Sequence, residues 1–502
     1  MLAAESNVTE APTALLANAV LRRRLVTAAC LLSVFMVAIE VTIVSTAMPT
    51  IVAQLDRFQI FSWVFAAYIL TSAVTAPVYG RLADLYGRKR VYYVGATLFL
   101  IGSALCGFAN SMVLLIAFRT IQGAGAGALQ PLTITILGDV YSAQERARVQ
   151  AWQSGVWGLA AIIGPVLGAF IVEHMPWALV FWINIPVGIL TLAMLALFFD
   201  ESPVRREHRV DYLGSILLML GVGAVLMAIV QADDLPGWLI GALAAGGTAA
   251  LALLVVHERR AREPIVPFAL WRARSVTASN LGGLCIGGVL MCTTVFLPTY
   301  VQGVLGRSAT VAGMTLAAQT IAWTVGSVTA ARVMAYTSFA RAGAAGGAVL
   351  IVGCAILVLA DRSSGLSWVA SGATIVGLGM GLCNTTFLVA CQSEVGWGDR
   401  GGAVSSNIFL RSIGMSLGAA LGGALVNFSI ARHAPGAGDA VRQILTPETR
   451  AGLDMQVLTQ VSEAIAQGLN QVYVVAGALA AGALISALCL PAGLSLHSTP
   501  KR

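Results

Sequence analysis

The stretch LVTAACLLSVFMVAIEVTIVSTAMP, residues 25–49, is long and apolar enough to cross a lipid bilayer as one helix. At 1.5 Å per residue it extends about 37 Å, whereas the hydrocarbon core of a bilayer is about 30 Å thick. The basic cluster Arg22-Arg23-Arg24 precedes the stretch, and Glu40 is the only acidic residue inside it. The sequence therefore predicts a membrane-spanning helix with one carboxyl group in its interior.

The composition of the whole chain indicates a membrane protein with many spans. Its 502 residues are 58% hydrophobic and 11% charged, whereas a soluble domain carries about 25% charged residues. The apolar runs are long and continuous, unlike the short alternating strands of a membrane barrel. We predict an all-α membrane protein of about fourteen transmembrane helices, at residues 25–48, 60–80, 91–109, 112–134, 150–172, 177–199, 212–231, 238–256, 277–300, 311–334, 343–360, 366–392, 402–428 and 471–492.

Two charged stretches divide these spans into groups of six, two and six. Segment 200–211 follows the sixth span, and the basic segment 257–274 follows the eighth. The simplest partition is two six-helix bundles with an inserted helix pair. We expect a cytoplasmic tail at 1–24, an N-terminal bundle at 25–200, basic linkers with two extra helices at 201–275, a C-terminal bundle at 276–495 with a long outer loop at 427–470, and a cytoplasmic tail at 496–502. Within the loop, 448–469 has the composition of an amphipathic surface helix.

The distribution of basic residues predicts the orientation, because cytoplasmic loops carry an excess of Lys and Arg. With a cytoplasmic N-terminus, the short outer loops hold only Arg57, Arg307 and Arg362. The inner loops then hold Arg81, Arg88, Lys89, Arg90, Arg146, Arg148, Arg205, Arg206, Arg209, Arg259, Arg260, Arg262, Arg272 and Arg274. We therefore expect a multi-pass protein of the cytoplasmic (inner) membrane with both termini inside. The same bias accounts for the net charge of +7 without a nucleic-acid partner.

Glu40 and Arg119 are the candidate proton-coupling residues. A carboxylate in hydrocarbon costs about 3 kcal/mol or more, and a group in such a place can take up and release a proton near neutral pH. Glu40 lies on an outward-running span and Arg119 on an inward-running one, each about 10 Å below the outer surface. The matched depth predicts an ion pair or a shared water-filled cavity. The coupling hypothesis requires Glu40 to face a hydrated cleft; in the alternative, Arg119 only binds backbone carbonyls.

The loop after the second span reads GRLADLYGRKR, residues 80–90. Gly80 and Gly87 allow a tight turn between closely packed helices, and Asp84 stands at a helix end where it can face a helix N-terminus. The complete pattern, with Arg88, predicts a conformational latch. The alternative is an ordinary basic inner loop with one neutralising acid.

The fifth span carries Gly158, Gly164, Pro165 and Gly168. Proline removes a helix hydrogen bond and favours a kink, and Gly164 with Gly168 forms a face on which another helix can pack closely. We interpret this segment as a kinked packing element.

Polar and aromatic residues inside the other spans are candidates for a substrate cavity. Arg411 lies about 13 Å from the cytoplasmic end of span thirteen, and its partner is not identifiable from the sequence. For each candidate the alternative is packing or interhelical hydrogen bonding. The candidates are Gln122, Gln130, Trp157, Asn184, Trp323, Asn407 and Arg411.

The motifs of enzymes and metal sites are missing from the sequence. It contains no HExxH, no phosphate-binding GxxxxGK[ST] and no Ser/His/Asp set, and the eight cysteines fall inside spans without metal or disulfide spacing. We expect no enzymatic activity, no metal and no cofactor other than a proton gradient.

These segments together resemble the major facilitator superfamily, and in particular its fourteen-helix drug:proton antiporter branch. The resemblance covers nearly the whole chain. Glu40 stands where the branch has Asp, and Ala169 where a second Gly is usual. The segments that carry it are EVTIVSTAMP (40–49), GRLADLYGRKR (80–90), RTIQGAGAG (119–127), the glycines and proline of 158–168, NIPVG (184–188), DYLG (211–214), PTYVQ (298–302) and RGGA (400–403).

The resemblance implies rocker-switch alternating access between two bundles and proton-driven export in which Arg119 and the acid of span one act in coupling. It also implies that Asp84 and Arg88 latch the bundles, with Asp84 facing the start of span thirteen near 401–405. The Glu40 substitution moves the carboxyl group by one methylene and keeps its proton chemistry.

Our hypothesis is thus a proton-coupled exporter of amphiphilic small molecules, acting as a monomer with its substrate, protons and the bilayer as partners. A dedicated exporter of one metabolite, antibiotic or siderophore is the first alternative. A membrane sensor that transports nothing is the second, and an importer is a third that the fifth-span segment disfavours.

Overall fold

A computed structural model describes residues 10–141, 143–201, 211–230, 235–261, 268–361, 364–396, 400–445, 450 and 452–491. Within these ranges all regular structure is helical, and fourteen helices are long and apolar enough to cross a membrane. Helices satisfy their own backbone hydrogen bonds, which is a requirement for any segment in contact with lipid. The chain is therefore a multi-pass α-helical membrane protein, as predicted.

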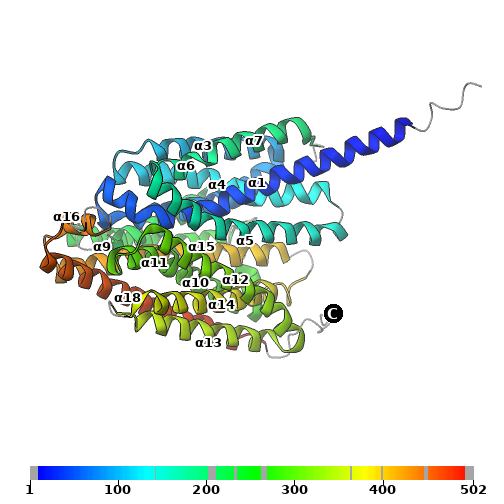
Figure 1. Ribbon diagram of the computed structural model, residues 1–502. Coiled ribbons are helices and arrows are strands. Elements are labelled where there is room, and N and C mark those ends of the chain that lie inside the picture. The colour runs from blue at the N-terminus through cyan, green and yellow to red at the C-terminus, as the bar shows by residue number, and fades with distance from the viewer. Residues whose placement is uncertain are drawn as a thin grey trace, which may run out of the picture.

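The N-terminal bundle comprises six membrane crossings (Figure 1). Its central contacts join α1 to α5, α2 to α4 and α3 to α4, with α7 packed on α1 and α3. The sixth crossing, expected as one helix at 177–199, is broken at Ile183 into a short helix and a longer one. The helices are α1 (Glu10–Leu55), α2 (Trp63–Tyr86), α3 (Arg88–Gly107), α4 (Met112–Val140), α5 (Ala143–His174), α6 (Leu179–Trp182) and α7 (Asn184–Phe198), with the 3₁₀ turn η1 (Phe58–Ile60) between α1 and α2.

The C-terminal bundle repeats this number of crossings. Here α10 packs on α15 and α18, α14 on α12 and α13, and α13 on α18. The first crossing of this bundle continues through α11 into a π-helical turn. The elements are η2 (Phe268–Arg272), α10 (Arg274–Thr294), α11 (Phe296–Thr299), η3 (Tyr300–Val304), α12 (Ala309–Tyr336), α13 (Phe339–Val358), α14 (Gly365–Ala390), α15 (Arg400–His433), α16 (Gly438–Ile444) and α18 (Met455–Leu488).

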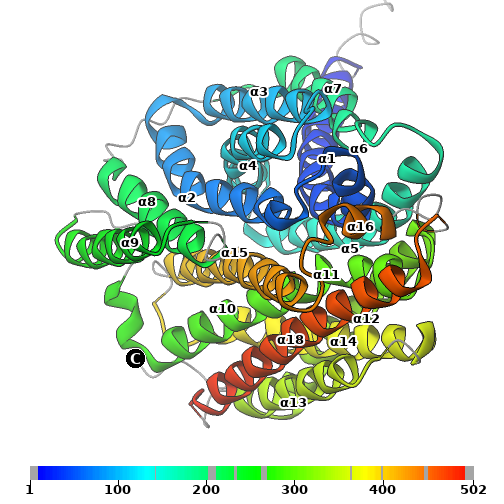
Figure 2. The ribbon, with the colours of Figure 1, turned by 90° about the vertical axis from the view of Figure 1, so that its left-hand side faces the viewer.

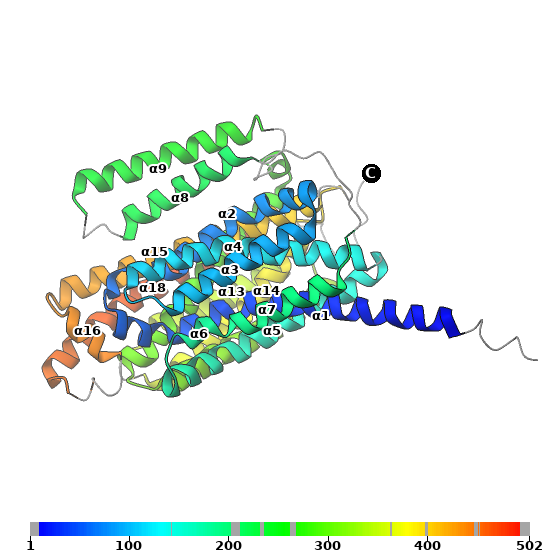
Figure 3. The same ribbon diagram turned by 90° about the horizontal axis from the view of Figure 1, so that it is seen from above.

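The inserted pair, α8 (Tyr212–Val230) and α9 (Gly237–Glu258), stands beside the two bundles (Figure 3). Only α8 contacts both bundles extensively, through α2 and α15. A separate apolar cluster joins Leu218 and Val222 of α8 to Leu70 and Val74 of α2 and to Ala420 of α15. The pair therefore lies across the junction of the bundles.

Several predicted boundaries are wrong. The expected outer loop 427–470 is shorter because α15 continues to His433 and α18 begins at Met455. The segment 10–24, expected as a cytoplasmic tail, is helical and continuous with α1, and its cytoplasmic location stays a prediction. The helix expected at 448–469 forms where it is described, since residues 455–469 are helical, but it is the first part of α18 and not a separate surface helix. Ala464 is fully buried there, and its carbonyl accepts a hydrogen bond of 2.8 Å from Ser429 of α15. Apolar packing on α15 extends both helices beyond the membrane-length pattern.

The two ends of the molecule differ in charge. At one end, which we call the basic end, Arg22 pairs with Asp200, the backbone N–H of Arg88 donates to Glu201, and Arg274 donates to the carbonyl of Cys489. At the opposite end, the far end, α16 lies against α1 and η1 and so extends from the C-terminal bundle over the N-terminal one (Figure 2).

The described hydrogen bonds between the bundles all lie towards the far end. Glu173 of α5 accepts from Thr310 of α12, Asn427 of α15 donates to the carbonyl of Gln59, and longer contacts of 3.5 Å join Gln302 to Thr46 and Ser416 to Ala66. This list includes only residues that the structure describes.

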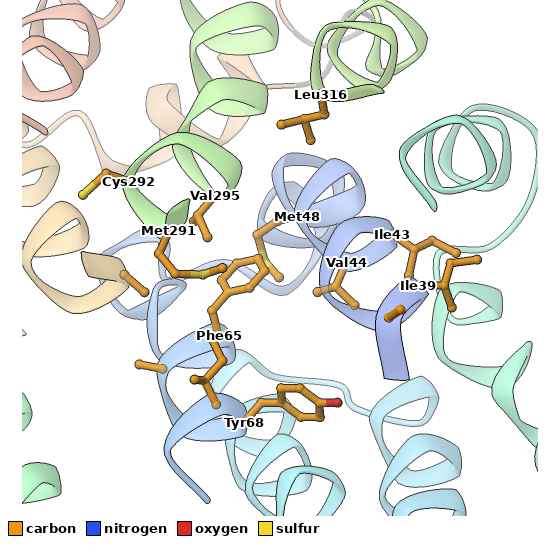
Figure 4. Packing of buried hydrophobic residues seen from close by; sticks show 14 of the residues in the cluster. Ile39, Ile43, Val44, Met48, Phe65, Tyr68, Met291, Cys292, Val295 and Leu316 are labelled. Atoms are coloured by element: carbon orange, nitrogen blue, oxygen red, sulfur yellow. The ribbon is translucent and has the colours of Figure 1, made fainter. Parts of the chain in front are cut away.

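An apolar plug supports the same contact. Met291 of α10 and Val295, the residue after α10, face Phe65 of α2 and Met48 of α1, and all four are at most 1% exposed (Figure 4). The bundles are thus closed against each other at the far end.

Candidate functional site

An ion pair between Glu40 and Arg119 is buried inside the N-terminal bundle. Glu40 comes from α1 and Arg119 from α4, where one Nη1–H of the guanidinium donates to Oε1 of the carboxylate. Neither side chain is more than 1% exposed. The pair therefore joins two helices that lie far apart in the sequence.

Polar side chains from three helices complete the hydrogen bonding of the pair. Asn184 at the start of α7 donates to Oε2 of Glu40 at 2.5 Å, and Arg119 donates to Oε1 of Gln122 at 2.7 Å. The Oγ of Ser103 on α3 accepts from both amides, each at 3.1 Å. Both carboxylate oxygens thus have donors, which a buried charge requires.

Arg119 has two further contacts on α2. Its Nε–H donates to the carbonyl of Val64 at 3.1 Å, and its guanidinium carbon lies 3.9 Å from the ring centre of Tyr68. A cation over an aromatic face is stabilised by the ring's negative face. Arg119 is therefore held by α1, α2 and α4 at once, and it binds a backbone carbonyl in addition to Glu40.

The surroundings of Glu40 differ from the predicted hydrated cleft. Its side chain is completely buried, and its described hydrogen bonds come from Arg119 of α4 and Asn184 of α7, both in its own bundle. The expectation of a hydrated cleft is wrong for this conformation. The physical reason is that Arg119 and Asn184 supply the donors that water would supply to Glu40 in a cleft, and Gln122 and Ser103 accept from these two side chains in turn.

The segment predicted as a latch makes contacts inside the N-terminal bundle. Gly87 has φ +94°, a conformation that favours glycine, and it ends α2 directly before α3. Arg88 pairs with Asp139 at the end of α4, and Glu201 accepts from the backbone N–H groups of Arg88 (2.5 Å) and Lys89 (3.1 Å).

The contact that would make this segment a latch between the bundles is not described. The side chain of Asp84 lies outside the described residues, and a methyl group at Gly80 would meet nothing within 4 Å. The latch stays a prediction.

The glycines of α5 mark a close approach to α1. A Cβ at Gly164 would lie 2.0 Å from Oγ1 of Thr42, and one at Gly168 would lie 2.7 Å from the carbonyl of Ile43. On the other side, a Cβ at Gly313 of α12 would lie 2.5 Å from the carbonyl of Pro165. The segment therefore packs both within its bundle and against α12, and α5 continues without a break through Pro165.

The remaining candidates are in different surroundings. Gln122 and Asn184 belong to the cluster around Glu40. Asn407 is 3% exposed and donates to the carbonyl of Ser279 at 2.6 Å, so the structure favours the packing interpretation for it. Arg411 is half-buried and donates to Asn384 of α14 at 3.0 Å. The last three candidates are all partly exposed, namely Gln130, Trp157 and Trp323.

Sequence reasoning missed Ser103, Glu173 and the partner of Arg411. A serine in an apolar helix carries no special signal, because its hydroxyl can also bind its own backbone. Glu173 had a weak signal, since it is an acid at the far end of a glycine-rich span. Asn384 gave none, because its pairing with Arg411 depends on how α14 and α15 pack.

Two six-helix bundles that meet around α2, α5, α12 and α15, with a charge pair buried in one of them, define an α-helical membrane carrier. The chain belongs to the Major Facilitator Superfamily, whose family model matches residues 30–419. Because this is a family of transporters, the chain is classed as a transporter and not as an enzyme.

Relatives in sequence and structure agree with this assignment. The chain is 32% identical over 465 residues to "Multidrug resistance protein 3" of Bacillus subtilis (strain 168), covering 89% of this chain and 91% of that protein. It is 32% identical to "Multidrug transporter protein MdtP" of the same organism, covering 81% and 76%. The crystal structure of a bacterial homologue of the human lysosomal transporter Spinster, inward-facing and unoccupied, superposes with a TM-score of 0.68 at 16% identity, covering 93% and 98%. That likeness concerns the fold alone.

Proposed function

We propose that this protein exports amphiphilic small molecules across the cytoplasmic membrane by alternating access, in exchange for protons. Export is supported by the names of the Bacillus relatives, which describe multidrug resistance and transport. A more distant relative, 27% identical over 428 residues, is named "Efflux pump FUS6" in Gibberella moniliformis. Proton exchange is supported by one observation, the buried pair of Glu40 and Arg119.

The orientation that we propose for the basic end determines which side of the membrane this conformation faces. Because cytoplasmic loops carry the excess of Lys and Arg, the basic end faces the cytoplasm and the far end faces outward. The bundles are hydrogen-bonded to each other towards the far end. This conformation is then the inward-facing one, ready to take substrate from the cytoplasm.

In the coupling step, a proton neutralises Glu40 and removes its attraction to Arg119. A buried pair is stable only while both charges are present, and losing one destabilises it by about 3–5 kcal/mol. Because Asn184 of α7 and Val64 of α2 bind the same pair, protonation changes the contacts of four helices. The proton reaches Glu40 in a second, outward-facing conformation, since no solvent contacts the carboxyl group here.

The sealed position of Glu40 also favours a second candidate. In this second candidate, the Glu40–Arg119 pair only links α1 to α4. Export is then coupled to protons through another group, or is not coupled to protons at all. Both candidates predict an exporter, and they differ in the effect of Glu40 on proton movement.

The test is proton release by the purified protein in weakly buffered detergent solution with a pH indicator. Under the first candidate, adding an exported amphiphile releases protons from the wild type and not from Glu40→Gln, and Glu40→Gln vesicles lose transport driven by a pH gradient. The matched control is Glu463→Gln, which changes an exposed carboxylate of α18. Full gradient-driven transport by a folded Glu40→Gln protein supports the second candidate and contradicts the first.

A further inference from the structure

Arg411 is a charged side chain in the interior of the C-terminal bundle. It lies eleven residues after the first residue of α15, which is about 16 Å along the helix axis. Its Nη1–H donates to Oδ1 of Asn384 at 3.0 Å, whereas its buried Nε–H has no partner among the described residues. Arginine stays protonated at any physiological pH. A full positive charge is thus held among helices with one neutral acceptor.

No carboxylate in the described part of the chain pairs with this charge. The only described acids that are buried are Glu40 and Glu258. Glu40 is neutralised by Arg119, and Glu258 is the last residue of α9 in the inserted pair. Unlike Arg119, Arg411 therefore has no counter-ion among the residues that the structure describes, and an uncompensated charge inside a helix bundle is costly unless it has a use.

The helical positions around Arg411 show which way it faces. Asn407 binds α10 through Ser279, Ser416 binds the α2 carbonyl of Ala66, and Ile413 packs with the cluster of the inserted pair. At 3.6 residues per turn, Arg411 lies about 40° from Asn407 and about 160° from Ile413. It therefore points away from the inserted pair, into the sector where Asn384 of α14 lies. The helix that carries it, α15, stands at the junction of the two bundles, because it also packs on α2.

We propose that Arg411 binds the acidic group of the exported molecule, so that the carrier selects anionic amphiphiles over cationic ones. This proposal rests on the export function proposed above and specifies its substrate class. A carboxylate, sulfonate or similar anion would accept from the guanidinium N–H groups that do not bind Asn384, because the side chain is only half-buried, while Asn384 holds the other side of the guanidinium in place. A cation entering the same sector would meet an unscreened positive charge and no described carboxylate.

A pair of probes with nearly the same shape and opposite charge tests the selection. 4-(1-Pyrenyl)butyrate is an anion whose carboxylate can accept from the guanidinium, and 4-(1-pyrenyl)butylammonium is a cation with the same aromatic body. Binding of each to the full-length protein is measured by equilibrium dialysis in detergent without a proton gradient, with protein-free micelles as the blank. We expect the wild type to bind the carboxylate at least tenfold more tightly after correction for the micelles. Equal affinities, or tighter binding of the cation, would overturn the proposal.

Three variants assign the preference to Arg411. Arg411→Gln removes the charge and should lower the anion-to-cation affinity ratio about tenfold, whereas Arg411→Lys should keep most of it. Asn384→Asp keeps the arginine and supplies a counter-ion at almost constant volume, so it should lower the ratio as Arg411→Gln does, even if the latter folds poorly. The control is Arg332→Gln, which changes an exposed arginine of α12.

An unchanged ratio in a folded Asn384→Asp protein, or an equal change in Arg332→Gln, contradicts the proposal. Because no gradient is present, failure here is distinct from failure of proton coupling. Loss of coupling would appear in the proton-release assay while the binding ratio stayed the same.

Discussion

Replacing Glu173 by Gln should open the far end of the carrier. The carboxylate of Glu173, at the end of α5, accepts the backbone N–H of Thr310 at 2.7 Å and also its hydroxyl. Thr310 stands in the first turn of α12, where N–H groups lack partners within the helix and negative charge is favoured. These two hydrogen bonds join the bundles. Glutamine keeps one acceptor oxygen and loses the charge.

The size of the effect follows from this geometry. A hydrogen bond to a charged group contributes about 1.5–3 kcal/mol, and because Glu173 is exposed we take the lower value, about 1.5 kcal/mol, for the change. That energy corresponds to about a tenfold shift in the ratio of open to closed molecules. Amide hydrogen exchange reports this ratio directly when closing is fast.

The assay is hydrogen exchange followed by mass spectrometry of protein in lipid nanodiscs. In Glu173→Gln, exchange should become about tenfold faster both near Thr310 and at 58–65, a segment of η1 and α2 that shares no hydrogen bond with Glu173. Acceleration confined to the first turn of α12 would refute the reasoning, because it would show local fraying without separation of the bundles. The control is Glu463→Gln, which changes an exposed acid near the far-end start of α18.

Two further predictions concern packing and charge. Glu40→Gln and Arg119→Gln should each lower the free energy of unfolding by about 3–5 kcal/mol, and the double variant should lose much less than the sum of the two losses. Thermal unfolding followed by tryptophan fluorescence measures the three losses. Additive losses would mean that the two charges are not coupled. Gly313→Ala places a methyl group 2.5 Å from the carbonyl of Pro165, so α12 must move from α5 and far-end hydrogen exchange should rise. Gly223→Ala, with nothing within 4 Å, should leave exchange unchanged, and equal behaviour of the two would contradict the packing argument.

The sequence alone was sufficient for the class of protein, the fourteen crossings and the division into bundles. These features depend on apolar runs whose length must match the bilayer, which is a local property of the chain. It also placed Glu40 and Arg119 at the same depth, because depth follows from counting residues along two helices of opposite direction. The matched depth left an ion pair and a shared cavity as alternatives.

Only the tertiary structure decided between them. Whether Glu40 meets water or Asn184 depends on how α1, α3, α4 and α7 rotate and pack, and the apolar pattern of a buried helix leaves that rotation open. The same reason explains why Ser103 and Asn384 were not foreseen as partners of the charged groups. The predicted ends of spans thirteen and fourteen were wrong because α15 and α18 continue past the length that a bilayer requires. They do so because they bury side chains such as Ala464 between them. Span length is thus encoded locally, whereas the pairing of polar groups across helices is a property of the assembled bundle.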